Sequence, residues 1–211
     1  MSTRASIFSF VTTLALLGCA EDLRGALGDG SEGADADSTD DDTGSGDGGP
    51  QVDHEQDGDT VITTVDATGD AVWIYLDLET RSQVTVADPL ASDAWDLAFK
   101  RYDIASNGGV SGPGGLTVAI VEGMELDAVT ALPSGPWLSD AVDGDDTNDD
   151  PDYVMSGWYD YDFMTHVLTP KPVVYVARTP EGTAFAIQVL DYYDDAGSSG
   201  WMQVRWRPWA E

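Results

Sequence analysis

The sequence predicts an all-β domain over residues 53–211, built as an antiparallel sandwich or an incomplete barrel with long loops. Apolar and aromatic residues recur at every second position in several short runs, as they do in strands with one buried face. These runs are separated by segments rich in Gly, Asp and Pro, which favour turns. No stretch of twelve residues carries a helical stripe of apolar side chains, so a helical fold is not expected.

The clearest strand pattern lies at 173–193. Alternate residues are apolar over 173–177 and again over 185–189, with a Thr-Pro-Glu-Gly segment at 179–182 between them. Pro in the second position and Gly in the fourth are typical of a type I turn. The whole segment is therefore predicted to form a β-hairpin.

Further strands and two long loops follow from the same patterns. Strands are predicted at 61–65, 84–87, 95–100, 116–121 and 201–206, and long loops at 105–115 and 132–152. Two sets of alternating residues are each predicted to share the buried face of a strand: Val72, Ile74, Leu76 and Leu78, and Trp95, Leu97 and Phe99.

Residues 1–18 have the composition of a secretory signal peptide. Arg4 precedes an apolar run at 7–17 that is too short for a permanent membrane-spanning helix. The run ends in Leu-Leu-Gly-Cys, which resembles the lipobox of bacterial lipoproteins and implies cleavage before Cys19 and acylation of that residue. An ordinary signal peptide with an incidental cysteine is the alternative. Ala20 is not the aspartate that favours inner-membrane retention, so the resemblance implies an exported, lipid-anchored protein of the outer membrane or cell surface.

Residues 19–52 are predicted to be a flexible, acidic tether that begins at the lipidated cysteine. Between positions 20 and 50 there are ten acidic side chains and one basic one, and 28–49 has no large apolar residue. Such a segment cannot bury enough surface to offset the entropy of ordering it. As a random coil it would span on the order of 30 Å between lipid and domain.

The charge of the domain limits its partners. Residues 51–211 carry 29 acidic and seven basic side chains, for a net charge near −22. Nucleic acids and anionic membrane surfaces would be repelled by this charge, so neither is an expected partner. Contact with a membrane is expected only through the lipid anchor.

Two loops invite comparison with known binding motifs. The glycine-rich segment 107–115 lacks the Lys-Ser/Thr of a phosphate-binding loop and has Pro113 where a nucleophile elbow needs glycine, so a surface loop is predicted. The acidic segment from Asp143 to Asp152 has carboxylates at the alternating positions of a weak Ca²⁺ site. It lacks the glycine and the final glutamate of a calcium loop, and a solvated acidic loop is the alternative.

The domain is not expected to be an enzyme. Its histidines are His54 and His166, the one cysteine of the chain is the lipidation candidate Cys19 before the domain, and no carboxylate pair is distinguished by the sequence. Ligand binding remains, because seven tryptophans and eight tyrosines can supply apolar walls. Imidazole and thioether groups are axial ligands of haem iron. The candidate donors of these two kinds are His166, Met124, Met155, Met164 and Met202.

Several segments resemble the HmuY-like haem-binding lipoproteins. Residues 95–109, WDLAFKRYDIASNGG, match a signature of the form WD-[IL]-A-F-x-R-[YF]-D-x-x-[TS]-N-x-G. Residues 173–182, VVYVARTPEG, followed by LDYY at 190–193, resemble the late hairpin of that family. Trp-Tyr at 158–159 and the segment 165–170 are also similar, so the resemblance covers most of 53–211.

The resemblance implies a haemophore, which takes haem from host or environmental haemoproteins and hands it to a TonB-dependent type of outer-membrane receptor. Family members ligate the iron through a pair of His or of Met side chains. Here this implies His166, on the same strand face as Met164, with the second ligand left open between Met124 and Met155 and Met155 preferred. Arg178 is expected to pair with Asp103, Asp191 or a haem propionate.

Two alternative functions use the same residues. One is a non-catalytic envelope interaction lipoprotein that keeps the fold without haem. The other is a calcium-stabilised glycan-binding module, which the acidic loop and the tryptophans would favour.

Overall fold

The computed structural model describes residues 51–144 and 150–209. The predicted signal peptide, Cys19 and the tether as far as Pro50 lie outside the described residues, as does the centre of the acidic segment at 145–149. The regular elements within the described ranges are β strands and single turns of 3-10 helix. No helix in this part of the chain is long and apolar enough to cross a membrane.

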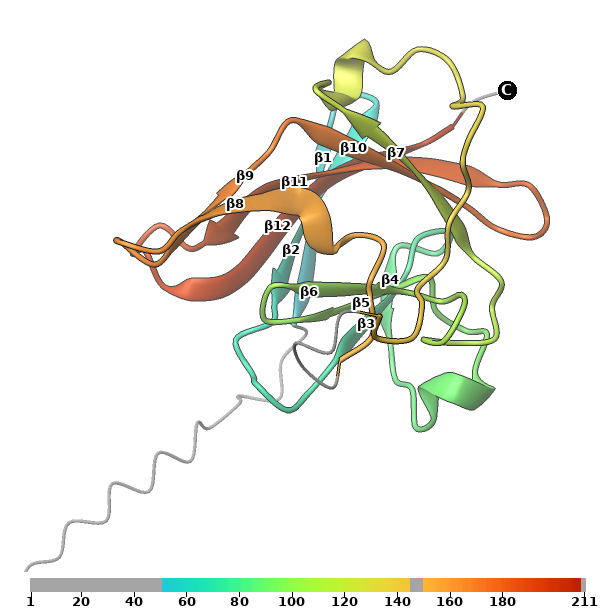
Figure 1. The fold of residues 1–211 in the computed structure, drawn as a ribbon, viewed down its shortest axis with the longest axis horizontal. Helices are drawn as coiled ribbons and strands as arrows, with labels where there is room; N and C mark the ends of the chain where they lie inside the picture. The colour runs from blue at the N-terminus through green and yellow to red at the C-terminus, as the bar shows by residue number, and fades with distance from the viewer. Residues whose placement is uncertain (1–50, 145–149, 210–211) are drawn as a thin grey trace, which may run out of the picture. The chain divides into compact units, whose positions relative to one another are not determined.

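The strands form three antiparallel sheets (Figure 1). The large sheet has the order β1-β2-β12-β11-β10-β7, the small sheet the order β4-β3-β5-β6, and β8 and β9 form a hairpin. The strands of the large sheet are β1 Val52–Asp57, β2 Thr60–Asp66, β7 Thr117–Glu122, β10 Val173–Arg178, β11 Ala184–Tyr193 and β12 Ser199–Pro208. The others are β3 Ile74–Asp77, β4 Ser82–Val84, β5 Leu97–Lys100, β6 Asp103–Ser106, β8 Tyr159–Asp162 and β9 Val167–Pro170.

The prediction of an all-β, antiparallel fold is confirmed, and the sheets do not close into a barrel. The predicted hairpin at 173–193 is also confirmed as β10 and β11, with Gly182 donating its N–H to the Thr179 carbonyl at 3.0 Å in the turn. Gly182 has a φ of +97°, a conformation that glycine adopts without strain.

One apolar core joins the two larger sheets. Strand β12 alternates buried and partly exposed residues, and its buried members Met202, Val204 and Trp206 share a cluster with Leu76 of β3 and Phe99 of β5. Strand β10 is buried on both faces instead, because the segment after β7 covers the outer face of the large sheet. Burial on both faces explains why its sequence is an unbroken apolar run.

Several local predictions are wrong. Val72 is 57% exposed and precedes β3, so it does not share the buried face of Ile74 and its partners. Trp95 precedes β5 and packs in a separate cluster with Ala98, on the opposite side from Leu97 and Phe99. Each residue lies before the strand begins, where alternation no longer sets the direction of a side chain.

The loops are shorter or more ordered than the sequence predicts. Strand β6 extends to Ser106 and so takes the start of the loop predicted at 105–115. The segment after η2 (Leu126–Ala128) is held by Asp140, a buried carboxylate that accepts the N–H groups of Ser106 at 2.8 Å and Val154 at 2.9 Å. Burial raises the pKa of Asp140 above its ordinary value. This one side chain fixes the long loop to the small sheet and to the segment that leads to β8.

Candidate ligand-binding site

An open cavity of about 450 Å³ lies between the β7–β10 edge of the large sheet and the start of β8. Strand β10 and edge strand β7 are paired so that Tyr175 lies beside Ile120. Ile120 is 39% exposed because β7 is the outermost strand of the large sheet within the described residues. The cavity is lined by Ile120, Glu122, Gly123, Val154, Gly157, Asp160, Lys171, Pro172, Val173 and Tyr175.

The lining combines apolar walls with a few polar groups. Tyr175 is almost fully buried, and this burial, followed by the nearby Glu122 charge, raises the pKa of its phenol far above the ordinary value. The phenol therefore stays neutral at any physiological pH. Lys171, whose N–H bonds to the Trp158 carbonyl at 2.8 Å, is the one cation among the lining residues. The cavity can hold an apolar body and pair one anionic group with Lys171.

Met124 lies at the border of this cavity. It follows the lining residue Gly123, and its backbone N–H donates to the carbonyl of Pro172, another lining residue, at 3.1 Å. Its side chain is 45% exposed, so no core packing holds the thioether in place. Of the methionines suggested by the sequence, Met124 is thus the one beside the cavity with an exposed side chain.

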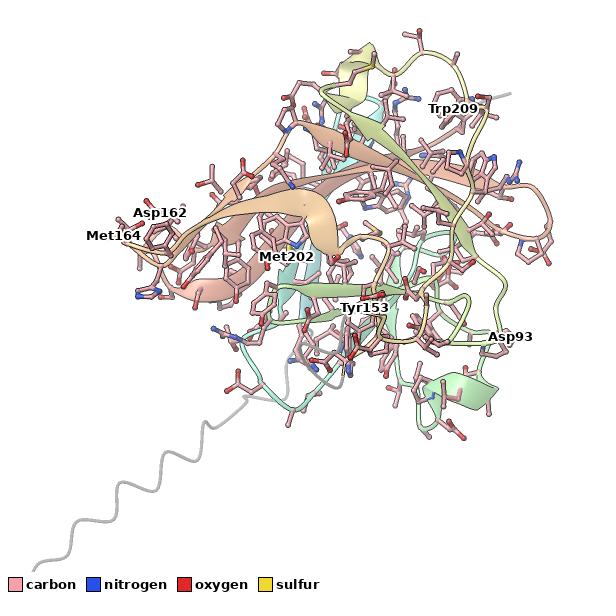
Figure 2. The ribbon with its side chains drawn as sticks, in the orientation of Figure 1. Asp93, Tyr153, Asp162, Met164, Met202 and Trp209 are labelled. Atoms are coloured by element: carbon pink, nitrogen blue, oxygen red, sulfur yellow. The ribbon has the colours of Figure 1, made fainter. Side chains whose placement is uncertain are left out.

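Met155 is placed differently, although Val154 and Gly157 on either side of it line the cavity. Its side chain is fully buried in the main core, as is that of Met202, whose place inside the sheets is visible in Figure 2. Both thioethers pack as core side chains in this structure. Met155 therefore has no exposed sulfur in this structure. Its role as a ligand of haem iron stays a prediction.

Met164, labelled in Figure 2, lies at the free end of the β8–β9 hairpin, and His166 lies in the same turn. Residues 163–166 form the turn, and His166 has a φ of +58°, so the two residues do not share one face of an extended strand as predicted. Met164 is 77% exposed, and the His166 Nδ1 contacts the Tyr161 hydroxyl. Strand β8 connects this end to the cavity through Asp160, and Asp162 lies roughly 7 Å further along it.

Arg178 makes a different contact from those predicted. Its guanidinium stacks over the Trp137 ring, 3.9 Å from the ring centroid. Among the described residues it has no ion pair with Asp103 or Asp191; Asp191 instead accepts the N–H groups of Tyr192 and Tyr193. Arg178 is outside the lining of the cavity, so its sequence-based assignment to a propionate gains no support from this placement.

The calcium hypothesis also gains no support. Within 51–144 and 150–209 no group of three or more His, Cys, Asp or Glu side chains is arranged to hold a metal ion. Asp152 is used locally, since its Oδ2 accepts the Gly144 N–H at 3.2 Å and its backbone pairs with Ala141.

Sequence reasoning did not identify the residues that form the cavity. Lys171 and Tyr175 lie only four positions apart. Lys171 is in a loop, and Tyr175 is in a strand whose apolar sequence predicts only core packing. Only the pairing of β10 with β7 brings them beside Ile120, and no local pattern could have shown this.

A comparison with protein-family models gives one match. The model described as HmuY protein matches residues 70–206, which is well over half of the chain. The chain belongs to the HmuY family. No curated protein sequence matches the chain.

Solved structures of HmuY-like proteins have a similar fold. A Tannerella forsythia apo HmuY analogue is 18% identical with a TM-score of 0.57, over 75% of this chain and 100% of that one. A Bacteroides fragilis protein assigned as a lipoprotein is 24% identical with a TM-score of 0.57, over 74% and 95% of the two chains. A Bacteroides vulgatus protein assigned as a HmuY-like haem-binding protein is 23% identical with a TM-score of 0.51, over 70% and 91%.

Proposed function

We propose that this HmuY-family chain is a surface-anchored lipoprotein that binds haem in the cavity between β7, β10 and β8 and passes it to an outer-membrane uptake receptor. The observation that carries the proposal is the position of that half-apolar cavity beside an exposed methionine, Met124. A similar protein from Bacteroides vulgatus is assigned as haem-binding, which supports the choice of ligand.

The residues present fit a porphyrin in three ways. Ile120, Val173 and Tyr175 offer apolar and aromatic surface to its faces. Lys171 offers a cation to a propionate carboxylate. Met124 is the thioether at the border, and His166 is an exposed imidazole on the hairpin that begins at the cavity. Bound haem would supply iron for transport, while the chain's own residues hold and desolvate it.

Titration of haemin into the purified protein, freed of any histidine tag, tests this function. We expect a saturable one-to-one shift of the Soret band at micromolar haemin. Met124→Leu keeps the volume and removes the sulfur, so it should shift or broaden the bands and lower the affinity only in part, because apolar burial of the porphyrin remains. His166→Ala is expected to change the spectrum as well, because the proposal takes the His166 imidazole as the second axial ligand of the iron.

The matched control is Met164→Leu, which removes another exposed sulfur at the end of the hairpin. Its spectrum and affinity should stay those of the natural protein. A protein with no saturable Soret shift, or one whose spectrum is unchanged in both Met124→Leu and His166→Ala, would favour an envelope interaction protein of the same fold that does not ligate haem through these residues.

The anchor in this proposal depends on Cys19, which lies outside the described residues. Expression of the full chain in a Gram-negative host with an alkyne fatty acid should label the protein in the membrane fraction. Cys19→Ser should remove the label, because no other cysteine can be acylated. Recovery of an unlabelled natural protein, cleaved at another position, would contradict the lipid anchor.

A further inference from the structure

Tyr175 brings a buried hydroxyl group to the proposed haem cavity, and this hydroxyl has no partner. The residue is 1% exposed, and its ring packs in the main core. Within 51–144 and 150–209, no side chain or backbone group forms a hydrogen bond with the phenol oxygen. Buried polar groups are almost always paired in proteins, so this hydroxyl is left to bond to a group that enters the cavity.

Two other lining residues, Gly157 and Glu122, place the Tyr175 hydroxyl at the cavity. A β-carbon at Gly157 would lie 3.8 Å from the Tyr175 oxygen and would meet nothing else within 4 Å apart from its own chain neighbours. Glycine therefore leaves that side of the hydroxyl open. Burial, and after it the charge of Glu122 on the paired strand β7, raises the pKa of the phenol, so the hydroxyl keeps its proton and acts as a donor.

Lys171 supplies a second unpaired donor to the same cavity. Its backbone is fixed on both sides, because its N–H donates to the Trp158 carbonyl and its carbonyl accepts the Val173 N–H, both at 2.8 Å. The side chain is partly buried, and its ammonium group forms no ion pair in the described part of the chain. Lys100, the other lysine, is used differently, since its ammonium lies 4.8 Å from the centroid of the Trp73 ring.

The two carboxylates that line the cavity are more exposed than these donors. Glu122 and Asp160 are exposed, whereas Tyr175 is buried and Lys171 is partly buried. Water screens the exposed charges, while a hydrogen bond away from water is electrostatically stronger. The buried part of the cavity therefore offers one neutral and one cationic donor. A carboxylate suits this pair, because each of its two oxygens can accept a hydrogen bond and its charge pairs with the ammonium.

We propose that the Tyr175 hydroxyl and the Lys171 ammonium together bind one carboxylate of the ligand, so that the cavity selects porphyrins with a free propionate whether or not they hold iron. This inference rests on the proposed function, because it describes a subsite of the haem cavity. It adds a contact that does not depend on Met124 or His166 as axial ligands. A porphyrin ester would leave the Lys171 charge without a partner and should bind less tightly.

Metal-free protoporphyrin IX and its dimethyl ester are the probes, and porphyrin fluorescence during titration with the purified, untagged protein measures their binding. The free acid should bind about tenfold more tightly than the ester, which cannot pair with a cation. Tyr175→Phe removes only the hydroxyl and should weaken binding of the free acid about tenfold. Tyr192→Phe is the matched control, because Tyr192 is 2% exposed but does not line the cavity, and it should leave both affinities unchanged.

Lys171→Met tests the charge, since it keeps most of the aliphatic chain and removes the ammonium. It should weaken binding of the free acid about tenfold and leave the affinity for the ester unchanged. Lys100→Met, which removes the ammonium that lies outside the cavity, should change neither affinity. Thermal unfolding verifies that each variant is folded. If Tyr175→Phe is not folded, Lys171→Met and the comparison of acid with ester provide the test.

The carboxylate subsite is overturned if acid and ester bind equally, or if either folded Tyr175→Phe or Lys171→Met keeps the natural affinity for the acid. Such a result would leave haem binding itself standing if haemin still gives a saturable Soret shift. Conversely, a haemin spectrum unchanged in Met124→Leu and His166→Ala would contradict ligation by these residues, while acid binding that depends on Tyr175 would still support the subsite. If neither haemin nor the metal-free porphyrin binds, both proposals are wrong.

Discussion

Replacing Trp158 with alanine should lower the free energy of unfolding by about 3–5 kcal/mol, the usual cost of deleting a fully buried aromatic side chain. Trp158 is 0% exposed and packs edge-on against Tyr159, with ring centroids 4.7 Å apart, and against Tyr192 at 6.0 Å. Its indole N–H also donates to the Tyr102 carbonyl at 2.9 Å. The change would leave a cavity in the core and an unpaired carbonyl at its edge.

Urea unfolding monitored by circular dichroism measures this loss. The matched control is Trp201→Ala on β12, where the side chain is only partly buried and the expected loss is smaller. Because Gly157 and Asp160 on either side of Trp158 line the proposed haem cavity, haem affinity should fall together with stability in Trp158→Ala. Equal losses of stability in the two variants would show that the short 3-10 helix η3 (Ser156–Trp158) is not anchored by its buried tryptophan.

The elements that the sequence predicts well are those in which local chemistry and tertiary packing agree. The hairpin at 173–193 has regular alternation on both sides of a Pro-Gly turn, and the structure forms it there. The strand at 61–65 is present as β2, with Val61 and Val65 buried on one face. These runs lie in the middle of the large sheet, where each buried side chain has a partner on a neighbouring strand.

The β8–β9 hairpin was not predicted. Strands β8 and β9 pair only with each other, and their residues are mostly exposed, so their sequence has no apolar alternation to detect. For this reason the sequence predicts Met164 and His166 on one face of a strand, although both residues lie in the turn between β8 and β9. The sequence also did not reveal the cavity proposed to bind haem, because its walls come from three separate elements, β7, β10 and the start of β8.

Asn107 belongs to the segment 95–109 that resembles the family signature, but the resemblance does not say what this residue does. The sequence match marks the residue, but its role appears only in the structure, where it is 1% exposed. Its side-chain amide donates to the Trp95 carbonyl at 2.7 Å and to the Ser92 carbonyl at 3.1 Å, and it accepts the Gly114 N–H at 2.9 Å. The predicted surface loop at 107–115 is thus folded around one buried amide, which also holds the backbone of Trp95 in place.

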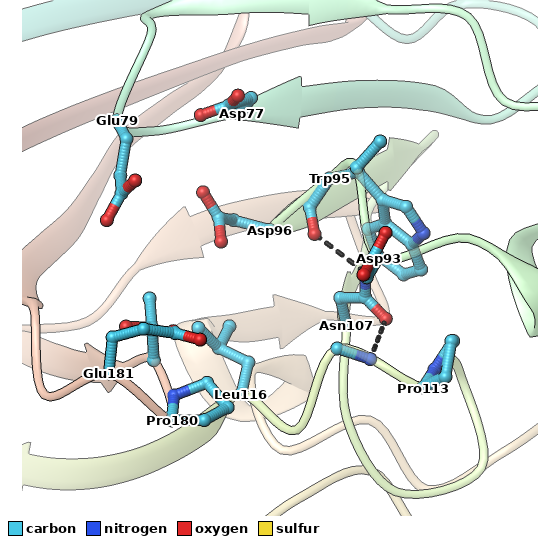
Figure 3. A pocket seen from close by; sticks show the side chains of 13 residues that line it. Asp77, Glu79, Asp93, Trp95, Asp96, Asn107, Pro113, Leu116, Pro180 and Glu181 are labelled. Carbon is cyan, nitrogen blue, oxygen red and sulfur yellow. Dashed lines mark hydrogen bonds between the residues drawn. The ribbon is translucent and has the colours of Figure 1, made fainter. Parts of the chain in front are cut away.

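Asp96→Asn should make the protein more stable at pH 7.5 and should flatten its stability profile between about pH 4 and pH 6. Burial of the Asp96 carboxyl raises its pKa from 3.8 to about 6, with further contributions from the Asp77, Glu79 and Glu181 charges, although the Leu78 N–H opposes the shift. These acidic neighbours surround Asp96 in Figure 3.

The direction of this change in stability follows because the folded state binds the Asp96 proton more tightly than the unfolded state does. Asp96 contributes its full stabilisation below about pH 4, where both states are protonated at this site, and loses it as the pH rises through its folded-state pKa of about 6. Ionisation of the buried group then costs the native state about 2–3 kcal/mol at neutral pH. Asparagine stays neutral and keeps a side-chain oxygen for the Leu78 N–H, which bonds to Asp96 at 2.7 Å.

Urea unfolding at a series of pH values measures the difference in unfolding free energy between Asp96→Asn and the natural protein. This difference should be largest at pH 7.5 and vanish near pH 4.

Asp194→Asn is the control, for which the opposite change in stability is expected. The Asp194 carboxylate accepts the N–H groups of Ser198 and Ala196 in the β11–β12 turn, and these bonds hold its pKa below the ordinary value. Its substitution should therefore weaken the fold at pH 7.5 and matter less in acid. If Asp96→Asn also weakened the fold at pH 7.5, the hydrogen bond from the Leu78 N–H to the charged carboxylate would stabilise the native state by more than burial of that charge costs.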